Sequence, residues 1–215
     1  MEGKENIVEK YSLHFLVIMY SVGVIGHNIE SLLPLMQILT PFTLLLTGGV
    51  VFYNTLKHSD KRIILWCVGT YFVTFLLEVI GVKTGLIFGG YNYGNVLGFK
   101  ILDTPLIIGL NWMFIILGVV LLVDKFFENV IVSVFFTGFI AVLFDYILEP
   151  VAINLGYWNW DNIEVPFQNY VAWFIIAVLA AFFFKLLKIE VRSPIPVQYF
   201  FVQLIFFLIL NYSLT

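Results

Sequence analysis

Four carboxyl groups lie in or beside apolar stretches of the sequence, where charged side chains are rare. They are Glu78, Asp103, Asp145 and Glu149. A carboxylate near the centre of a bilayer costs about 3 kcal/mol on insertion scales, so such residues face the interior of a helix bundle and usually serve a function. In an apolar pocket a carboxyl group can hold its proton at neutral pH and act as a general acid. The candidate chemistry is therefore proton transfer.

Asp145 and Glu149 form the clearest pair, because they are four residues apart and so lie one turn apart on one face of a helix. Two carboxyl groups this close in a low dielectric oppose each other's ionisation, so one of them is expected to stay protonated. The alternative is that Glu78, Asp145 and Glu149 only cap helices or fix their packing. Asp103, two residues before Pro105, is first a candidate helix N-cap and second a catalytic residue.

Other kinds of site have little support in the sequence. There is no pair of histidines at helical ligand spacing, no serine nucleophile elbow and no glycine-rich phosphate loop, so we expect neither a metal nor a cofactor. The single cysteine, Cys67, cannot form an internal disulfide. His27, Asn28 and Glu30 form a polar cluster that either closes the acidic pocket or is a solvated loop.

The composition places these acids in a membrane protein. Hydrophobic residues make up 61% of the 215 residues and charged residues 12%, and the mean hydropathy is +0.99. Soluble domains are about 45–50% apolar and about 25% charged, so an ordinary soluble enzyme and a disordered chain are excluded. A net charge of −3 without a basic patch also excludes a nucleic-acid binder. The sequence predicts an all-α, polytopic integral membrane protein with one transmembrane domain over residues 1–215.

Seven apolar stretches are long enough to cross the membrane, which takes about 20 residues. They are residues 12–29, 34–56, 63–80, 104–123, 130–149, 168–187 and 196–212. The first is expected to be retained as an anchor. Lys and Arg are enriched on the cytoplasmic side of membrane proteins. Here nine lie on the side of the N-terminus, and Lys83 and Lys100 lie on the other. We expect a multi-pass protein of the cell membrane with a cytoplasmic N-terminus and an outer C-terminus.

The two long outer connections look alike. In each, an acidic residue is followed after 11 residues by a glycine and after 14 by an asparagine between two aromatic residues. A proline then begins the next helix, and a tryptophan follows the proline by seven. These residues are Glu78, Gly89, Asn92, Pro105 and Trp112 in the first unit and Asp145, Gly156, Asn159, Pro166 and Trp173 in the second. We infer two parallel helix–loop–helix repeats, residues 63–123 and 130–187, related by an axis along the membrane normal. Two similar aromatic interface turns are the alternative.

Aromatic side chains in and after these loops predict an apolar pocket that opens toward the outer leaflet. They are Tyr91, Tyr93, Trp112, Tyr157, Trp158, Trp160 and Trp173. Such a pocket suits a lipid-like substrate, and aromatic faces stabilise cations. A protonated carboxyl group beside it is suited to protonating an alkene, and water or an internal double bond would then trap the carbocation.

Two groups of motifs resemble the carotenoid biosynthesis membrane protein family. They are EVIGVKTGLIFGGYNY at residues 78–93, and DYILEPVA, GYWNW and VPFQNY at 145–152, 156–160 and 165–170. The resemblance covers about residues 65–185. The family includes CruF-type carotenoid 1,2-hydratases and bisanhydrobacterioruberin hydratases. It implies cofactor-independent hydration of the terminal C1=C2 bond of an acyclic carotenoid. The implied partners are this substrate and membrane lipid, with other carotenoid-pathway enzymes as further candidates.

Carried onto this sequence, the resemblance implies that Asp145 or Glu78 protonates C2 and that water adds to the tertiary cation at C1. Glu149 would tune the acid or orient the water. The amides of Asn92 and Asn159 would hold the water or the product hydroxyl, and those of Gln168 and Asn169 could hold a water. The tryptophans would surround the cation.

Small membrane lycopene cyclases resemble the chain more distantly. Their pattern places two acids after a proline, whereas residues 105–108 here are Pro-Leu-Ile-Ile and residues 166–169 are Pro-Phe-Gln-Asn. This difference argues against cyclisation. Three interpretations stay open: a hydratase, a cyclase or other carotenoid-modifying enzyme, and a non-catalytic carrier or scaffold for carotenoid or lipid.

Overall fold

The computed structural model of the protein describes residues 2–162 and 164–214, without the side chains of residues 2–6 and 8. Lys4, one of the basic residues counted for orientation, lies outside the described side chains. The helices are α1 (Glu2–His27), η1 (Glu30–Leu32), α2 (Leu33–Lys57), α3 (Arg62–Thr84), α4 (Leu106–Val123), α5 (Val130–Asn154), α6 (Phe167–Leu186) and α7 (Ile195–Leu214). The strands are β1 (Tyr91–Tyr93), β2 (Lys100–Ile101), β3 (Thr104–Pro105) and β4 (Trp158–Trp160). The predicted all-α class is confirmed.

Among the described residues, six helices are long and apolar enough to cross a membrane: α2 together with η1, and α3 to α7. This fits the predicted multi-pass protein. The first predicted span corresponds to α1, which is not among the six. It is less hydrophobic because it includes Lys10, His14 and His27. Its passage through the membrane therefore stays a prediction.

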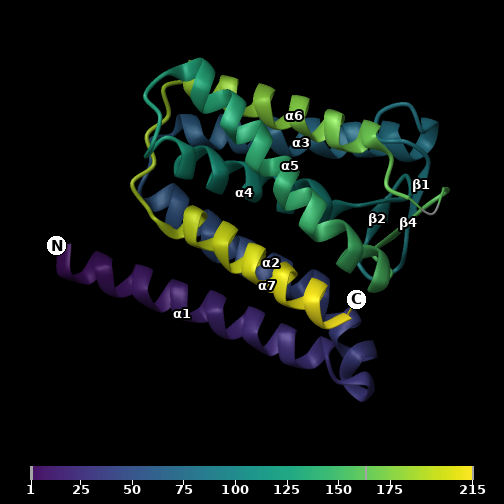
Figure 1. Ribbon diagram of the computed structural model, residues 1–215. Helices are drawn as coiled ribbons and strands as arrows, with labels where there is room; N and C mark the ends of the chain where they lie inside the picture. The colour runs from purple at the N-terminus through teal and green to yellow at the C-terminus, as the bar shows by residue number, and fades with distance from the viewer. Residues whose placement is uncertain (1, 163, 215) are drawn as a thin grey trace.

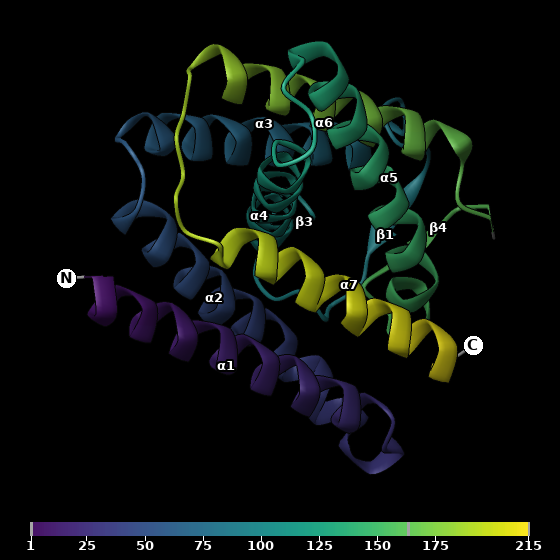
Figure 2. The ribbon, with the colours of Figure 1, turned by 60° about the vertical axis from the view of Figure 1, so that its left-hand side comes forward.

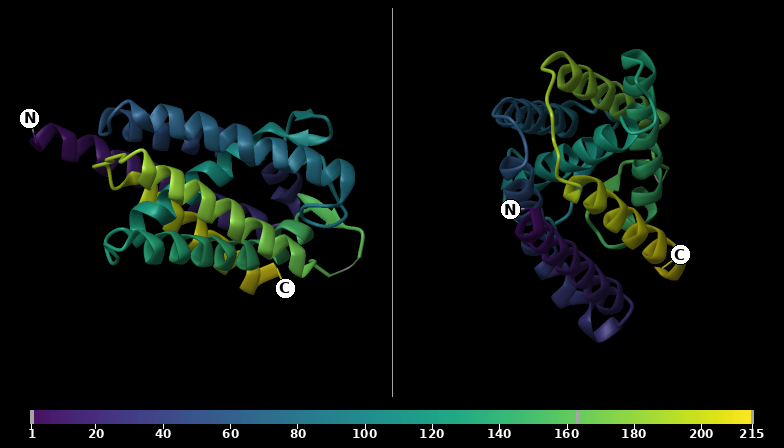
Figure 3. Two further views of the ribbon diagram at one scale, coloured as in Figure 1. Left: turned by 90° about the horizontal axis from the view of Figure 1, so that it is seen from above. Right: turned by 90° about the vertical axis from the view of Figure 1, so that its left-hand side faces the viewer.

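The helix α4 lies in the middle of the bundle (Figure 2). Its sequence is apolar on nearly all sides, which is typical of a helix that is covered all round. It packs against α3, α5 and α7. α1 and α2 lie on one side of the bundle and α3 and α6 on the opposite side (Figure 3). The strands all lie at the end of the bundle away from the N-terminus (Figure 1).

Prolines mark the starts of two helices. Pro105 and Pro166 occupy the N-cap positions of α4 and α6, with extended ψ angles of 132° and 138°. A proline there loses no helical hydrogen bond, because N–H groups at a helix start have no helical partner. The predicted span over residues 130–149 ends directly before Pro150, but the helix does not end there. Pro150 lies inside α5, which continues to Asn154 with Val151 fully buried.

The two long loops that follow α3 and α5 pair with each other. β1 and β4 are antiparallel, with Asn92 opposite Asn159 at the centre of the register. These asparagines are equivalent positions of the predicted repeat. The equivalent glycines Gly89 and Gly156 both have positive φ, 104° and 71°, a backbone conformation that glycine adopts without strain. The two related units stay a prediction, and the strands themselves were not expected.

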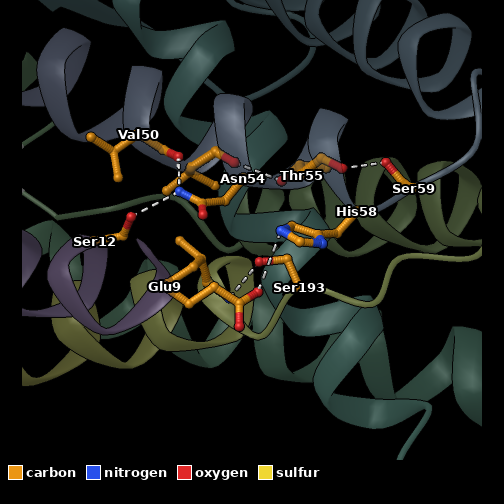
Figure 4. A network of polar contacts seen from close by, with 10 residues as sticks. Glu9, Ser12, Val50, Asn54, Thr55, His58, Ser59 and Ser193 are labelled. Carbon is orange, nitrogen blue, oxygen red and sulfur yellow. Dashed lines mark hydrogen bonds and ion pairs between the residues drawn. The ribbon is translucent and has the colours of Figure 1, made fainter. Parts of the chain in front are cut away.

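Polar contacts at the opposite end tie three segments together (Figure 4). Asn54 Nδ2 of α2 donates hydrogen bonds to Ser12 Oγ of α1 at 3.0 Å and to the Val50 carbonyl oxygen at 2.8 Å. His58 Nε2 lies 4.0 Å from Glu9 Oε1. The connection between α6 and α7 joins the same cluster, since the Arg192 amide donates to the His58 carbonyl oxygen. These contacts fix α1 against α2 at the end away from the strands.

Candidate active site

Three carboxyl groups converge at the strand end of the bundle. Glu78 comes from the last turns of α3, and Asp145 and Glu149 come from the end of α5. Their residues are 3%, 1% and 3% exposed. All three line one cavity of about 20 Å³, which has room for about one water molecule. The other lining residues are Phe88, Tyr91, Tyr93, Ile108, Trp112, Trp158, Trp160, Asn169 and Trp173.

Glu78 is held by the two tyrosines of β1. The hydroxyl groups of Tyr91 and Tyr93 both donate to Glu78 Oε2, the second at 2.7 Å. Burial is the main cause that raises the pKa of both phenols well above the ordinary value, and the charge of Glu78 is the second. Both phenols therefore keep their protons and stay donors to this acid.

Glu149 is held in the matching way by β4. The indole N–H groups of Trp158 and Trp160 both donate to Glu149 Oε2, each at 3.0 Å. Alternate residues of a strand point to the same side, so each three-residue strand directs two aromatic donors at one acid.

The same alternation turns the central asparagines away. Asn92 and Asn159 are exposed, and Asn92 Nδ2 lies 3.4 Å from Asp161 Oδ1. The structure therefore does not bring these two amides to the cavity, contrary to the role expected for them.

Asp145 has a different partner. Its Oδ2 accepts a hydrogen bond from Asn169 Nδ2 at 2.6 Å, and the same amide nitrogen lies 3.5 Å from Glu149 Oε1. Asn169 is three residues after Pro166, and the equivalent position after Pro105 is Ile108. The two halves of the site therefore differ here: an amide faces the cavity from one half and an aliphatic side chain from the other.

Aromatic rings form the remaining wall of the cavity. The rings of Trp112 and Trp173 are stacked, and Trp173 is also stacked on Phe88 at a centroid distance of 5.2 Å. Tyr91 lies against Trp160 at 5.0 Å. The sequence predicted these tryptophans and tyrosines but not Phe88. The available signal was its place directly before Gly89 of the repeated loop.

Asp103 is not part of the site. Leu102 and Asp103 are the central residues of the tight hairpin between β2 and β3, both with positive φ. The Asp103 side chain is 72% exposed and pairs with Lys83, which holds the pKa of Asp103 below its ordinary range. The N-cap prediction is wrong because β3 intervenes and Pro105 takes that position, without a side-chain cap.

The three residues of the predicted polar cluster at the end of α1 differ in their exposure. Asn28 and Glu30 are exposed, whereas His27 is buried and lines a second cavity next to the acidic one. Across residues 2–162 and 164–214, no group of three or more His, Cys, Asp or Glu residues is arranged to hold a metal ion.

The sequence of the chain matches a known protein family. A profile described as "Carotenoid biosynthesis protein" matches residues 39–214. The chain belongs to this family. The match contains the three buried acids and both paired loops, and it begins within α2. The chain is therefore a protein of carotenoid biosynthesis.

One relative has a more specific name. The bisanhydrobacterioruberin hydratase of Haloarcula japonica is 29% identical over 133 residues. The match covers 58% of this chain and 45% of the relative, so the chain spans less than half of the relative's length. No solved structure matches the chain.

Proposed function

We propose that the protein is a carotenoid hydratase that adds water across the terminal C1=C2 double bond of an acyclic end group. The observation that carries this proposal is the unequal hydrogen bonding of three buried carboxyl groups around a water-sized cavity. The hydratase relative and the family match support the same reaction class.

Asp145 is the proposed proton donor. Hydrogen bonds from donors favour the ionised form of a carboxyl group. Glu78 and Glu149 each accept two hydrogen bonds on Oε2 from phenol or indole donors, whereas Asp145 accepts one from a neutral amide. Asp145 is therefore the group best suited to carry a proton. It protonates C2, and the π electron pair forms the new C–H bond.

The resulting tertiary cation at C1 has two sources of stabilisation. The carboxylates of Glu78 and Glu149 supply negative charge in a site of low dielectric, and the faces of Trp112 and Trp173 supply ring quadrupoles. Water in the cavity then adds to C1, and its excess proton returns to Asp145. Water supplies both the hydrogen and the hydroxyl group, so this reaction balances without a cofactor.

The proposed orientation places the cavity near the outer face. The ends of α3 and α5 that carry the acids lie at the strand end of the bundle (Figure 1). Basic residues concentrate in the connections at the other end. The substrate would then be held in the outer leaflet of the cell membrane.

Pigment analysis tests the proposal. We would express the wild type, Asp145→Asn and the matched control Asp103→Asn in a bacterial host that makes lycopene and γ-carotene. The wild type and the control should give a pigment heavier by one water with an unchanged chromophore, and Asp145→Asn should not. Hydration by Asp145→Asn would refute the assigned acid. A new pigment of unchanged mass would instead indicate cyclisation.

A further inference from the structure

A second, larger cavity adjoins the acidic one. It has a volume of about 130 Å³ and lies between α1, α2, α4 and α7. Its lining is mainly apolar and includes Met36, Leu44, Leu97, Leu148, Phe206 and Phe207. Ile108 and Trp158 line both cavities. The two spaces therefore meet at these two side chains.

The volumes indicate different contents. The acidic cavity has room for about one water molecule and is too small for a branched five-carbon end group. An apolar cavity of about 150 Å³ binds benzene, which has six carbon atoms. The larger cavity, at about 130 Å³, is thus of the size of one isoprenoid unit.

The large cavity reaches the apolar outer surface between α1 and α2. Val22 and Leu39 line it and are also 55% and 40% exposed. Exposed apolar side chains on a membrane-spanning bundle face lipid tails. A hydrocarbon can therefore pass from the bilayer into this cavity without crossing water.

One residue of the cavity lining, His27, has a buried ring nitrogen without a partner among the described residues. His27 Nδ1 lies 2.7 Å from the Gly23 carbonyl oxygen, so it carries the ring proton and Nε2 is an acceptor. His27 is 6% exposed, and Nε2 receives no hydrogen bond from the described chain. A buried acceptor without a donor is unfavourable, so a ligand hydroxyl or a water molecule at this position is favoured.

We propose that this cavity is the chain subsite of the hydratase, in which the isoprenoid end of the substrate enters between α1 and α2 and presents its double bond at Ile108 and Trp158. The inference rests on the proposed function. It also explains the difference between the repeat halves. Asn169 closes the acidic cavity on the polar side, where water is needed, and Ile108 closes it on the hydrocarbon side.

Two adjacent leucines of α2 give a matched test. Leu44 lines the cavity, whereas Leu45 does not and is 53% exposed. Purified Leu44→Trp and Leu45→Trp would be compared with wild type for lycopene bound in detergent, for its induced circular dichroism and for hydration. Leu44→Trp should bind lycopene at least about tenfold more weakly and raise KM, because its ring occupies the subsite; Leu45→Trp should match wild type.

A second pair of variants, at Leu39 and Ile38, keeps the test decisive if Leu44→Trp does not fold. Leu39 lies at the mouth, where a larger ring needs no repacking, and Ile38 is 64% exposed and outside the cavity. Leu39→Trp should weaken lycopene binding and Ile38→Trp should not. Equal binding by the members of both pairs, or no lycopene bound by wild type, would overturn the chain subsite. If binding depends on Leu44 and Leu39 but wild type forms no hydrated pigment, the subsite stands and the hydratase proposal fails.

Discussion

Trp112 and Trp173 stack face to face, with ring centroids 3.7 Å apart and an interplanar angle of 17°. Each lies seven residues after the proline that precedes its helix, so equivalent positions of the two predicted repeat units contact each other. Asn92 and Asn159 pair in the same way in the register of β1 and β4. Residues related by a two-fold axis meet their own equivalents only near that axis. The predicted axis between the two units would therefore pass beside the acidic cavity, which both tryptophans line.

Removing one ring of this stack should cost stability and activity together. Trp173→Ala should lower the free energy of unfolding by about 3–5 kcal/mol, the range for deleting a large buried aromatic side chain. Trp173→Phe should cost less and keep part of the hydration activity, because a ring face remains. Thermal unfolding in detergent and pigment yield per folded protein measure the two effects.

Trp66→Phe is the control for this loss. Trp66 is buried and its indole donates to the Ala180 carbonyl oxygen, away from the acidic cavity. We expect lower stability with normal hydration per folded protein. If Trp66→Phe and Trp173→Phe reduce hydration equally, the stacked pair has no special role in the reaction.

The amide of Asn169 should be needed for the acid to function. Asn169→Leu keeps a similar size but removes the donor to Asp145 Oδ2. A hydrogen bond to a carboxyl group that can ionise is worth about 1.5–3 kcal/mol, so hydration should fall roughly 10–100-fold. Gln168→Leu is the control, since the Gln168 side chain is exposed and donates to the Leu86 carbonyl oxygen. Wild-type turnover in Asn169→Leu would show that this amide does not position the acid.

Much of the candidate site could be predicted, because the spacing of residues along a helix fixes which side chains point in the same direction. Asp145 and Glu149 are one turn apart, so their convergence followed from the sequence. Trp112 and Trp173 followed from their equal distance to a proline. The apolar stretches likewise marked the helices, because a bilayer demands long runs of apolar residues.

Directions within the loops could not be predicted. A three-residue strand is too short to show an alternating pattern, so nothing indicated that Asn92 would face outward while Tyr91 and Tyr93 face the acid. The N-cap prediction for Asp103 was wrong for a related reason. Asp103 lies in the turn of a tight hairpin with positive φ, and β3 separates it from the helix that it was expected to cap. The larger cavity also depends on how α1 and α2 pack, which hydropathy does not specify.

Because the side chains of Asn92 and Asn159 point outward, we expect their replacement to have little effect on stability or activity. Asn92→Ala and Asn159→Ala should each change the free energy of unfolding by at most about 0.5 kcal/mol and leave hydration unchanged, because both side chains are exposed. Tyr93→Phe, one residue away from Asn92, should reduce hydration because it removes a donor to Glu78. Pigment yield per protein compares the three variants. A large loss in Asn92→Ala would mean that its amide reaches the substrate.

The tyrosines of β1 predict a dependence of stability on alkaline pH. Burial raises the pKa of Tyr91 and Tyr93 above that of an unfolded tyrosine, about 10. Above that pH the unfolded chain loses these protons while the folded protein keeps them, so stability falls as pH rises, by about 1.4 kcal/mol per pH unit for each group. The double variant Tyr91→Phe/Tyr93→Phe should therefore lose stability less steeply above pH 10. Unfolding temperatures would be measured against pH for the wild type and the double variant. Equal slopes of the two curves above pH 10 would contradict this prediction.

Cysteine labelling tests the proposed orientation and the passage of α1 through the membrane. Cys67 is buried and can be replaced by Ala to give a background without cysteine. Single cysteines at the exposed positions Tyr11, Asn95 and Lys125 then report on three segments. Asn95 lies between β1 and β2, in the loop predicted to face outward, and should react with a membrane-impermeant maleimide in intact cells. Tyr11 and Lys125 lie on the side rich in Lys and Arg and should react only after permeabilisation.

The pattern of labelling separates the alternatives. If Tyr11 reacts in intact cells together with Asn95 while Lys125 does not, α1 does not cross the membrane and six spans remain. If Lys125 reacts in intact cells and Asn95 does not, the orientation is reversed and the acidic cavity faces the cytoplasm. The expected pattern, with Asn95 alone labelled, requires α1 to cross. The mouth of the large cavity between α1 and α2 would then face lipid on the outer side, next to the acids that need the substrate.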